Sequence, residues 1–310
     1  MERIITYSSA TTYCQCARKY YWRYELGLRP KIDEESEALR DGIHGHDILR
    51  VYLSSGWISA IAFIGQWRES QPAIGEDATR ELDQRAAKLS AMIRAVSMMW
   101  PAGEQPRAEV LLTAPVRMPS GRKLYCWTFR GKADAVDNSR LIDWKFTSDP
   151  TRTIRELDLS FQAELYASAL LRQGVTLTTV HYRLIHVPQI KFCGKDADAA
   201  AYEDRALALL QEPGRLQTHE AFLNQARIAK ATSWICEVAQ QISYNRKKHL
   251  ARALVGPSSC WLGNRLACHD WSRTCEYYPL CSAMANGADV DWLIGENYAE
   301  GERHPELSEA

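Results

Sequence analysis

The stretch Phe129-Arg-Gly-Lys-Ala-Asp-Ala-Val-Asp-Asn-Ser-Arg-Leu-Ile-Asp-Trp-Lys-Phe-Thr147 decides how this chain is expected to fold. Two segments rich in apolar residues flank the polar Asn-Ser pair at 138–139, which suits a tight turn, so the stretch predicts a β-hairpin. Side chains alternate between the two faces of a strand. Asp143 and Lys145 are therefore expected to share one face, while Trp144 points to the other.

Three charged groups are expected to converge at one end of this hairpin. Asp134, on the partner strand, can reach the end that carries Asp143 and Lys145. Two carboxylates can hold a hard cation through oxygen, with a lysine beside the water bound to it. The alternative is an exposed ion pair at a strand edge. Trp144 and Phe146 argue instead for an internal strand, where a charge is costly unless it has a function. The hairpin therefore predicts metal-assisted hydrolysis.

Three motifs follow one another along the chain. They are Gly42-Ile-His-Gly-His46, then Gly131-Lys-Ala-Asp134 followed by Asp143-Trp-Lys145, then Gln162-Ala-Glu-Leu-Tyr166. The middle motif resembles the signature of the PD-(D/E)XK nucleases, with a glycine-led turn in place of the nominal proline. The outer two resemble the G-x-x-x-H and Q-x-x-x-Y motifs of the RecB-like exonuclease branch. Three motifs in the family's order are far more specific than any one of them.

This resemblance implies a fold and an active site. The fold is an α/β one, with a restriction-endonuclease-like mixed β-sheet flanked by helices. A Mg2+ or Mn2+ ion would be held by His46, Asp134, Asp143 and the carbonyl of Trp144. Lys145 would orient the attacking water, and Gln162 and Tyr166 would contact the DNA backbone or position that water. Glu109, at the start of the first strand, matches a supplementary acidic residue of some relatives, although a polar strand end explains it equally well.

The histidine of the first motif has a structural alternative. A single histidine on a helix, here expected over 36–54, more often has a structural role than a catalytic one. Gly42 and His46 are four residues apart and so share a helix face. The missing side chain of Gly42 lets another backbone or a substrate approach the imidazole. This spacing and the resemblance favour His46 as a metal ligand.

Residues 6–26 are expected to form a helix in which basic and aromatic side chains are interleaved. Such a surface can contact phosphates and stack on bases, so Arg18, Lys19 and Tyr20 are candidate DNA-binding residues. The alternative is an amphipathic helix whose aromatic residues lie in the core. The run that begins Cys16-Ala-Arg-Lys-Tyr resembles the start of the iron-sulfur nucleases, with alanine in place of their usual proline.

Nine cysteines are present, and four of them lie between Cys260 and Cys281. Without a secretory signal, clustered cysteines favour metal ligation over disulfides. Cys268, Cys275 and Cys281 lie in a loop with few apolar residues, and three thiolates need a fourth ligand. All-sulfur coordination suits zinc or an iron-sulfur cluster, and the spacing does not decide between them.

The resemblance supplies Cys16 as the fourth ligand. It implies a 4Fe-4S cluster held by Cys16, Cys268, Cys275 and Cys281, as in RecB-like phage exonucleases, AddB and the CRISPR adaptation nucleases. Their commonest spacing begins with C-x-x-C, whereas Ser272 occupies that position here. Cys14 or Cys260 is therefore an alternative ligand. Such a cluster would join residue 16 to residue 281 and close a loop of most of the chain.

Composition sets broad limits on the function. At 310 residues and 46% hydrophobic content, the chain can bury a sizeable core. Its 38 Lys and Arg residues equal its 38 Asp and Glu residues, so any DNA groove must be a local patch. There is no signal-peptide pattern and no 18-residue apolar stretch, so we expect a cytoplasmic protein with no membrane contact. The family resemblance implies a bacterial host cell.

Four regions are expected along the chain. They are a helical region with the first cluster cysteine over 1–105, a nuclease core over 106–195, C-terminal helices and the cysteine cluster over 196–285, and a peripheral tail over 286–310. Strands are expected over 178–187 and 189–193, and helices over 196–211 and 218–252.

The expected function is a metal-dependent DNA exonuclease of phage or prophage type, acting in DNA recombination, replication or repair. Its partners would be DNA, with single-stranded ends, and a recombination or replication protein. A CRISPR-type adaptation nuclease that processes prespacer DNA would use the same residues. A non-catalytic DNA-binding protein with structural zinc is a third possibility. Asp134, Asp143 and Lys145 argue against it, because a binding module does not need an unpaired acidic pair facing phosphate.

Overall fold

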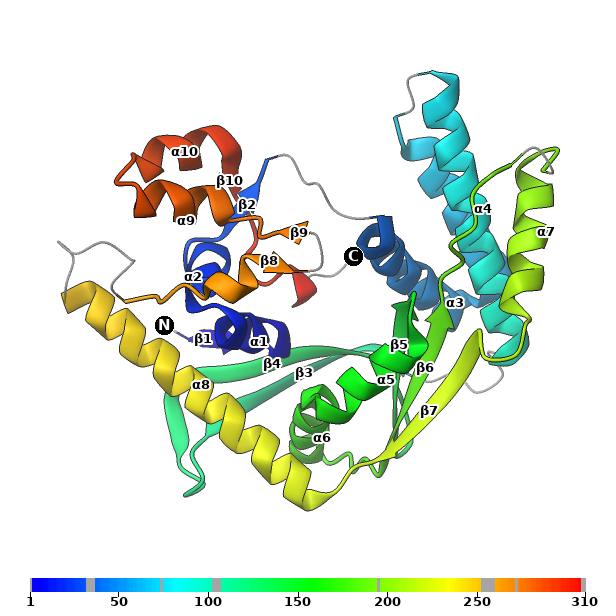
Figure 1. Cartoon of the computed structure of the whole chain (residues 1–310). Helices are drawn as coiled ribbons and strands as arrows, with labels where there is room; N and C mark the ends of the chain where they lie inside the picture. Colours follow the sequence, from blue (N-terminus) through cyan, green and yellow to red (C-terminus); the bar gives the residue numbers. More distant parts are fainter. Residues whose placement is uncertain are drawn as a thin grey trace.

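The computed structural model describes residues 2–31, 37–72, 75–101, 107–193, 196–251, 260–270 and 273–307. A mixed six-stranded sheet lies at the centre of the molecule (Figure 1). Its strands are β1 (Arg3–Ile5), β3 (Arg107–Arg117), β4 (Lys123–Asp137), β5 (Arg140–Thr147), β6 (Thr179–His186) and β7 (Leu216–Phe222). The pairs β1–β4 and β5–β6 are parallel, and β3–β4, β4–β5 and β6–β7 are antiparallel. The expected α/β fold with a mixed sheet is confirmed.

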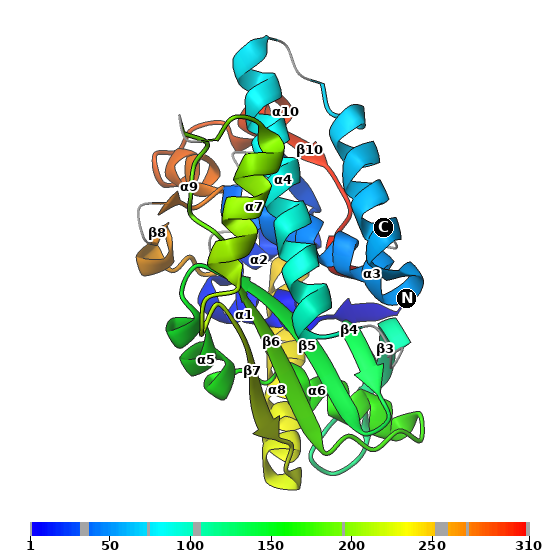
Figure 2. The same cartoon turned by 90° about the vertical axis from the view of Figure 1, so that its right-hand side faces the viewer.

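Helices cover both faces of this sheet, and each face has its own hydrophobic core. The first core contains side chains of α1 (Tyr7–Gln15), α6 (Gln162–Arg172) and α8 (Gln225–Ala251). The second contains side chains of α3 (Glu37–Ser70), α4 (Glu76–Met99) and α7 (Ala199–Leu210), which stand together in Figure 2. On β5, Leu141 belongs to the first core, and Ile142 and Trp144 belong to the second. Both faces of the strand are therefore buried.

Two segments after β6 differ from the sequence expectation. A helix is expected over 218–252, whereas β7 occupies the start of that range and α8 begins only at Gln225. Half-buried and exposed side chains alternate along β7, and most of them are polar. Its backbone pairing with β6, from Thr179–Phe222 to Ile185–Leu216, makes this segment an edge strand. The strand expected over 189–193 has no regular structure.

A second unit faces the sheet and combines the two ends of the described chain (Figure 1). We call residues 16–30 and 260–300 the cysteine module. It contains α2 (Ala17–Tyr20), the π-helix η1 (Tyr21–Glu25), β2 (Leu28–Pro30), η3 (Arg265–Ala267), β8 (His269–Asp270), β9 (Arg273–Thr274), α9 (Tyr278–Ala285), α10 (Val290–Asn297) and β10 (Tyr298–Glu300). Cys16 has an extended backbone, with φ −159° and ψ 107°, and separates α1 from α2. The single helix expected over 6–26 is therefore interrupted at this cysteine.

Aromatic side chains form the core of the cysteine module. The ring of Tyr20 stacks on Tyr24 and on Trp261, with centroids 5.3 Å and 5.9 Å apart. Tyr21 also stacks on Trp261, at 5.4 Å. All four rings are buried, so the aromatic run of the N-terminal segment supplies packing rather than an exposed surface.

The residues after 286, expected to be peripheral, are integrated into the fold. Strand β10 pairs antiparallel with β2, and Tyr298 stacks on Tyr277 at 5.8 Å. Beyond β10, the Gly301 N–H donates to the carbonyl of Gly27 at 2.8 Å. The chain then reaches η4 (Pro305–Leu307), which contacts β4 of the sheet. This segment thus connects the cysteine module to the sheet.

Helix α3 is apolar and bent. Contrary to the expectation, its portion Gly42–Ser70 is long and apolar enough to cross a membrane. By length and composition alone this is weak evidence, because core helices pass the same test. Gly56, with φ 83° and ψ 173°, interrupts the helical path, and α3 packs on α4 and β5. Its N-terminal half thereby holds His46 beside the sheet.

Candidate active site

The strands β4 and β5 separate at the place where the predicted catalytic carboxylates lie. They pair only at Ala135–Ile142, Val136–Leu141 and Asp137–Arg140, around the expected turn at 138–139. Before Ala135 the strands diverge, and Asp134 Oδ2 accepts a hydrogen bond from the Trp144 N–H at 2.8 Å. At this point, a hydrogen bond to a side chain thus replaces the backbone hydrogen bonds that join the two strands. The two strands form a fork with Asp134 on one arm and Asp143 on the other.

Asp143 and Lys145 project together into this fork, as the strand alternation predicts. The Lys145 Nζ lies 2.8 Å from Asp143 Oδ2. Trp144 points the opposite way and is fully buried, packed edge-on against Trp100 at 5.2 Å and beneath the Arg183 guanidinium at 4.9 Å. The buried indole anchors the strand, so the two charged side chains are held at fixed positions.

His46 approaches the fork from α3. Its Nδ1 lies 3.5 Å from Asp134 Oδ1, and its ring packs edge-on against Phe146 at 5.4 Å. The glycine that permits this approach is Gly45, because a Cβ there would lie 2.5 Å from Phe146 Cζ. A Cβ at Gly42 would meet no described atom within 4 Å. The close approach of protein to this helix thus occurs at Gly45, and the approach of a substrate beside Gly42 stays a prediction.

Gln162 and Tyr166 lie on one face of α6 beside the fork. Gln162 accepts a hydrogen bond from Lys145 Nζ at 3.4 Å, and its Nε2 donates to the Tyr166 hydroxyl at 3.0 Å. The Tyr166 ring is buried against Gly131, where a Cβ would lie 2.5 Å from Tyr166 Cε1. Gly131, which leads the middle motif, thus admits the tyrosine of the last motif.

The charges in the fork affect one another. Burial raises the pKa of Asp143, whose side chain is 7% exposed, and the Asp134 charge adds to this effect against the pull of Lys145. Burial also opposes ionisation of Asp134, but His46 and Lys145 outweigh it and lower the pKa of Asp134. Burial alone would lower the pKa of Lys145, yet the two carboxylates raise it. Lys145 is therefore a cation at neutral pH.

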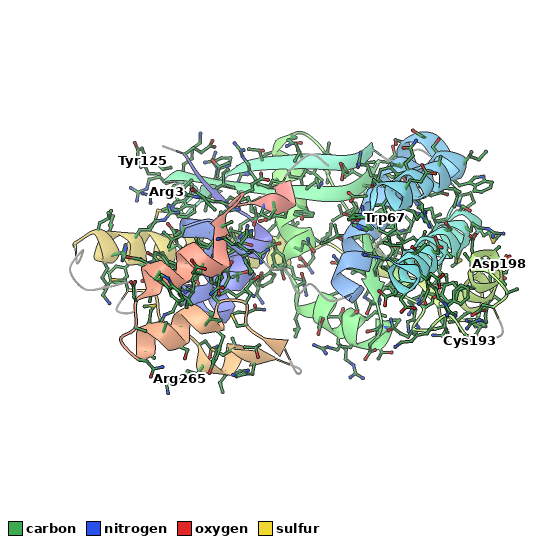
Figure 3. All side chains as sticks on the ribbon, turned by 90° about the horizontal axis from the view of Figure 1, so that it is seen from above. Arg3, Trp67, Tyr125, Cys193, Asp198 and Arg265 are labelled. Atoms are coloured by element: carbon green, nitrogen blue, oxygen red, sulfur yellow. The ribbon has the colours of Figure 1, made fainter. Side chains whose placement is uncertain are left out.

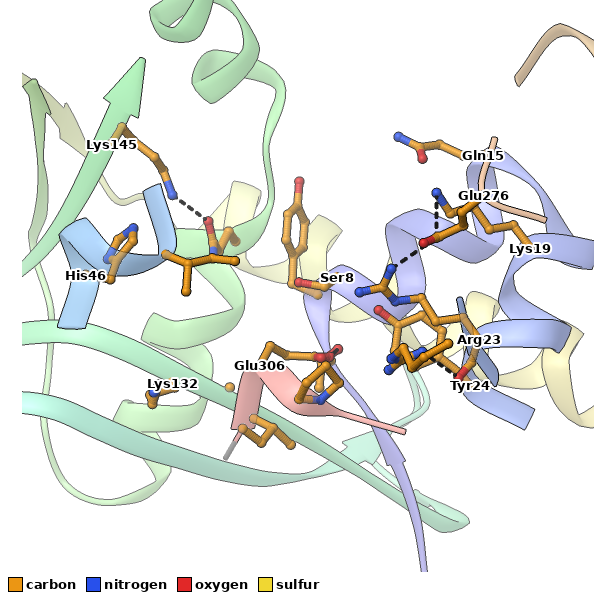
Figure 4. A pocket seen from close by; sticks show the side chains of 18 of the residues that line it. Ser8, Gln15, Lys19, Arg23, Tyr24, His46, Lys132, Lys145, Glu276 and Glu306 are labelled. Carbon is orange, nitrogen blue, oxygen red and sulfur yellow. Dashed lines mark hydrogen bonds and ion pairs between the residues drawn. The ribbon is translucent and has the colours of Figure 1, made fainter. Parts of the chain in front are cut away.

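The fork opens into a cleft of about 2090 Å3 between the sheet and the cysteine module (Figure 4). Its sheet wall carries Asp134, Asp143, Lys145 and Lys132, and its module wall carries Lys19 and Arg23. The size and the two polar walls suit a polymer better than a small molecule.

Each wall of the cleft has two cations that share one carboxylate. On the sheet wall, Glu109 lies 3.0 Å from Lys132 Nζ and 3.7 Å from Arg50 Nε. On the module wall, Glu276 lies 3.3 Å from Lys19 Nζ and 3.1 Å from Arg23 Nη1. Each group carries one net positive charge toward the cleft. The chain as a whole is neutral, so this is the kind of local basic patch that its composition requires.

A comparison with protein families identifies the group to which the chain belongs. The sequence profile described as "PD-(D/E)XK nuclease superfamily" matches residues 4–282. The chain belongs to the PD-(D/E)XK nuclease superfamily. No curated protein matches it. A crystal structure named "Putative exonuclease" from Eubacterium rectale is similar over 82% of this chain and 83% of that chain, with 11% identity and a TM-score of 0.42. That likeness is too distant to assign a substrate.

Nucleases of this superfamily typically use a divalent metal, and the fork has donors of the right kind. The Oδ2 atom of Asp143 is buried, and the Lys145 ammonium, at 2.8 Å, is its charged neighbour. Asp134 and His46 add further oxygen and nitrogen donors. Carboxylate oxygens are preferred by Mg2+ and Mn2+. Within the described ranges, however, no three His, Cys, Asp or Glu side chains are gathered as a formed metal site.

The fold places the four predicted cluster cysteines in one neighbourhood. The Asn264 N–H lies 3.3 Å from Cys16 Sγ, and Cys268 Sγ lies 3.7 Å from the Asn264 carbonyl. The Cys275 N–H donates to the Cys268 carbonyl at 2.8 Å, and Cys281 lies on α9. Within the described residues, these sulfurs do not form a preassembled metal site either. Ser272, at the usual ligand position, lies outside the described residues.

The two alternative ligands have different surroundings. Cys14 is on α1 and contacts Trp234 of α8, and Cys260 is buried next to Trp261 in the sequence. None of the nine cysteines, all of which lie in described segments, forms a disulfide.

The three predicted DNA-binding residues have different surroundings in the structure. Tyr20 is 1% exposed and cannot stack on bases, because its ring is part of the module core. Arg18 Nε donates to the carbonyl of Trp261 at 3.2 Å, which gives it a structural contact within the module. Lys19 alone of the three lines the cleft. The expectation is therefore corrected for Tyr20 and remains a prediction for Lys19.

Sequence reasoning did not find the shared-carboxylate groups. Glu109 faces Asp134 across the β3–β4 ladder, between the pairs Ala108–Ala135 and Val110–Ala133. It has φ 47°, in the left-handed region that non-glycine residues seldom adopt. Arg50 and Glu276 come from distant parts of the chain. No local pattern marks them, because their proximity arises only in the fold.

Proposed function

We propose that this protein is a Mg2+- or Mn2+-dependent DNA exonuclease. The observation that carries the proposal is the β4–β5 fork, which presents Asp134, Asp143 and a charged Lys145 to a cleft of about 2090 Å3. His46, Asp134, Asp143 and the Trp144 carbonyl would hold the metal. When bound, the metal supplies a Lewis acid and lowers the pKa of a coordinated water.

The protein's own residues would position the scissile phosphate. Lys145 remains protonated and so acts as a fixed cation that stabilises negative charge developing on the phosphate, not as a base. Gln162 accepts a hydrogen bond from Lys145 and is itself bound to Tyr166, which keeps the amine directed into the fork. The cation groups around Glu109 and Glu276 would hold the strand from both sides of the cleft.

A biological role in DNA recombination, replication or repair, of the kind encoded by phages and prophages, fits the three motifs and is part of this proposal. We expect DNA with single-stranded ends as the substrate. A CRISPR-type nuclease would use the same fork, and substrate choice separates the two roles.

The test is cleavage of linear single-stranded and duplex DNA with Mn2+ by the wild type and by Asp143→Asn. Asp158→Asn is the matched control, because Asp158 is a carboxylate on helix α5 (Pro150–Leu159) with 61% side-chain exposure. We expect Asp143→Asn to be inactive and Asp158→Asn to be fully active. Equal activity in all three proteins would rule out the proposed site.

We further propose that Cys16, Cys268, Cys275 and Cys281 hold a structural 4Fe-4S cluster, with zinc as the alternative. Support comes from the contacts that Asn264 makes with Cys16 and Cys268, which bring the two ends of the chain together. Iron content and visible absorption of protein purified without oxygen test this proposal. Cys275→Ser should lose the metal, whereas Cys193→Ser, an exposed thiol outside the module, should keep it. Zinc, or no metal, in the wild type would contradict the cluster.

A further inference from the structure

The segment of residues 301–307, which we call the strap, crosses from the cysteine module to the sheet. Two hydrogen bonds secure its start: the Gly301 N–H donates to the Gly27 carbonyl, and the Arg29 guanidinium donates to the Glu302 carbonyl. His304 packs on the Tyr24 ring at 5.3 Å. At the far end, Glu306 accepts a hydrogen bond from the Thr6 hydroxyl at 2.5 Å. The strap is thus held to both walls of the cleft.

The strap lies inside the cleft and not behind it. Pro305, Glu306 and Leu307 line the same cavity as Asp134, Asp143 and Lys145. In Figure 4, Glu306 lies between Lys132 of the sheet wall and Arg23 of the module wall. Any strand that continued along the cleft past the fork on this side would meet the strap.

The two sides of the cleft differ. On the β4 side, the strap runs from the module to the sheet, where η4 contacts β4. On the opposite side, α5 (Pro150–Leu159) and the β8–β9 hairpin face each other in Figure 1, and Figure 3 shows the two walls from above. Arg152 of α5 and Tyr278 of α9 line the cavity there. A strand can therefore enter on the α5 side, whereas the β4 side is crossed by protein.

The charge of Glu306 adds to this difference between the two sides of the cleft. Burial alone would raise the pKa of Glu306, but hydrogen bonds from His304 and Thr6 outweigh it and lower that pKa below its usual value. Glu306 is therefore anionic at neutral pH, at the crossed side. Burial chiefly raises the pKa of Tyr166, and the charges of Asp143, Asp134 and Glu306 add to the effect, so the Glu306 charge is felt at the active site. A phosphate backbone would be repelled there.

We propose that the strap is the specificity element that restricts this nuclease to strand ends. A chain terminus can enter from the α5 side and stop at the fork. A continuous strand would have to pass the strap or turn back through the opening by which it entered. This inference rests on the proposed nuclease activity and explains why that activity would be exonucleolytic.

The test compares two single-stranded DNA substrates of one sequence, a covalently closed circle and the same molecule linearised, with Mn2+. We expect the wild type to degrade the linear form and to leave the circle intact. A truncation that ends at His304 removes η4 and should raise the ratio of circle to linear cleavage by about tenfold or more, equivalent to about 1.4 kcal/mol of relative barrier. An unchanged ratio in an active truncation would overturn the role of the strap.

A second variant tests the strap in case the truncated protein does not fold. Replacing residues 305–307 by three glycines keeps the chain length but removes the Glu306 contacts, and it should raise the same ratio. Trp292→Ala, a change on α10 at a side chain with 64% exposure, is the control and should leave the ratio unchanged. Wild-type protein that cuts circles as fast as linear strands would overturn the inference while leaving the nuclease activity intact. Wild-type protein that cuts neither substrate would reject both.

Discussion

The sheet wall of the cleft holds its functional groups on continuous strands, whereas the cysteine module holds its own on short elements. In the sheet, the β4–β5 fork and the buried Trp144 fix Asp134, Asp143 and Lys145 through backbone pairing. In the module, strands of two or three residues are joined by aromatic stacking and by contacts between the two ends of the chain.

This contrast shows which interactions stabilise each wall. Backbone ladders are distributed over many residues, so the loss of one side chain leaves the sheet in place. The module depends on a few large side chains and on contacts between the two ends of the chain. We therefore expect substitutions on the sheet wall to lower the cleavage rate while the fold stays intact. Substitutions in the module should instead lower the stability of the fold.

The largest effect should come from the module core. Trp261→Ala removes a ring that is 1% exposed and stacks on Tyr20 and Tyr21, and it should cost about 3–5 kcal/mol of stability. Hydrogen exchange should increase over residues 260–285 while β5 stays protected. Equal loss of protection in β5 would show that the two walls unfold as one unit, and the contrast would fail.

A change on the sheet wall should affect chemistry and leave the fold intact. Lys145→Gln should lower the DNA cleavage rate about 10²–10³-fold, the usual cost of losing one group that stabilises developing charge. Circular dichroism and the melting temperature should remain close to those of the wild type. Lys123→Gln, at an exposed position on the neighbouring strand β4, is the matched control and should retain full activity.

Two glycines of one motif should behave differently. Gly45→Ala places a methyl group against Phe146 and should cost about 1–3 kcal/mol of stability, as overpacking usually does. It should also reduce activity, because Phe146 supports the His46 ring. Gly42→Ala meets no described neighbour and should be neutral or stabilising, since alanine favours helix. Thermal melts of the two variants decide this, and the reverse order would contradict the packing of α3 on β5.

The strap that joins the two walls should depend on pH through Glu306. Its folded-state pKa is lowered, so the carboxylate contributes stability above the pKa of the unfolded chain, and this contribution is lost as pH falls through the folded-state value. Glu306→Gln should therefore melt below the wild type at pH 7, and the two melting temperatures should converge as the pH falls below the lowered pKa of Glu306. A constant difference over this range would mean that the charge of Glu306 does not hold the strap.

The smallest effect should come from the shared carboxylate of the module. Glu276→Gln leaves Lys19 and Arg23 without their counter-charge, so DNA should bind a few-fold more tightly at low salt. The gain should shrink as salt increases. Weaker binding would show instead that Glu276 positions the two cations, and the module wall would then be as preorganised as the sheet wall.

From the sequence by itself, turn residues and strand alternation determined the hairpin around 138–139 and the common face of Asp143 and Lys145. The mixed α/β fold was implied by the family resemblance that the motifs carry. The order of the three motifs also indicated the family, and the structure brings their residues to one fork. The same local rules failed at β7, where a polar edge strand forms through pairing with β6.

Only the tertiary structure decided which residues face the cleft. Tyr20 and Lys19 are neighbours in the sequence, yet one is in the core and the other lines the cavity. The close approach at Gly45 and the course of the strap likewise depend on partners far away in the chain, Phe146 and Thr6. Long-range proximity leaves no periodic trace in a single sequence, because it arises from how whole elements pack. For that reason the motifs could be read from the chain, but the shape of the cleft could not.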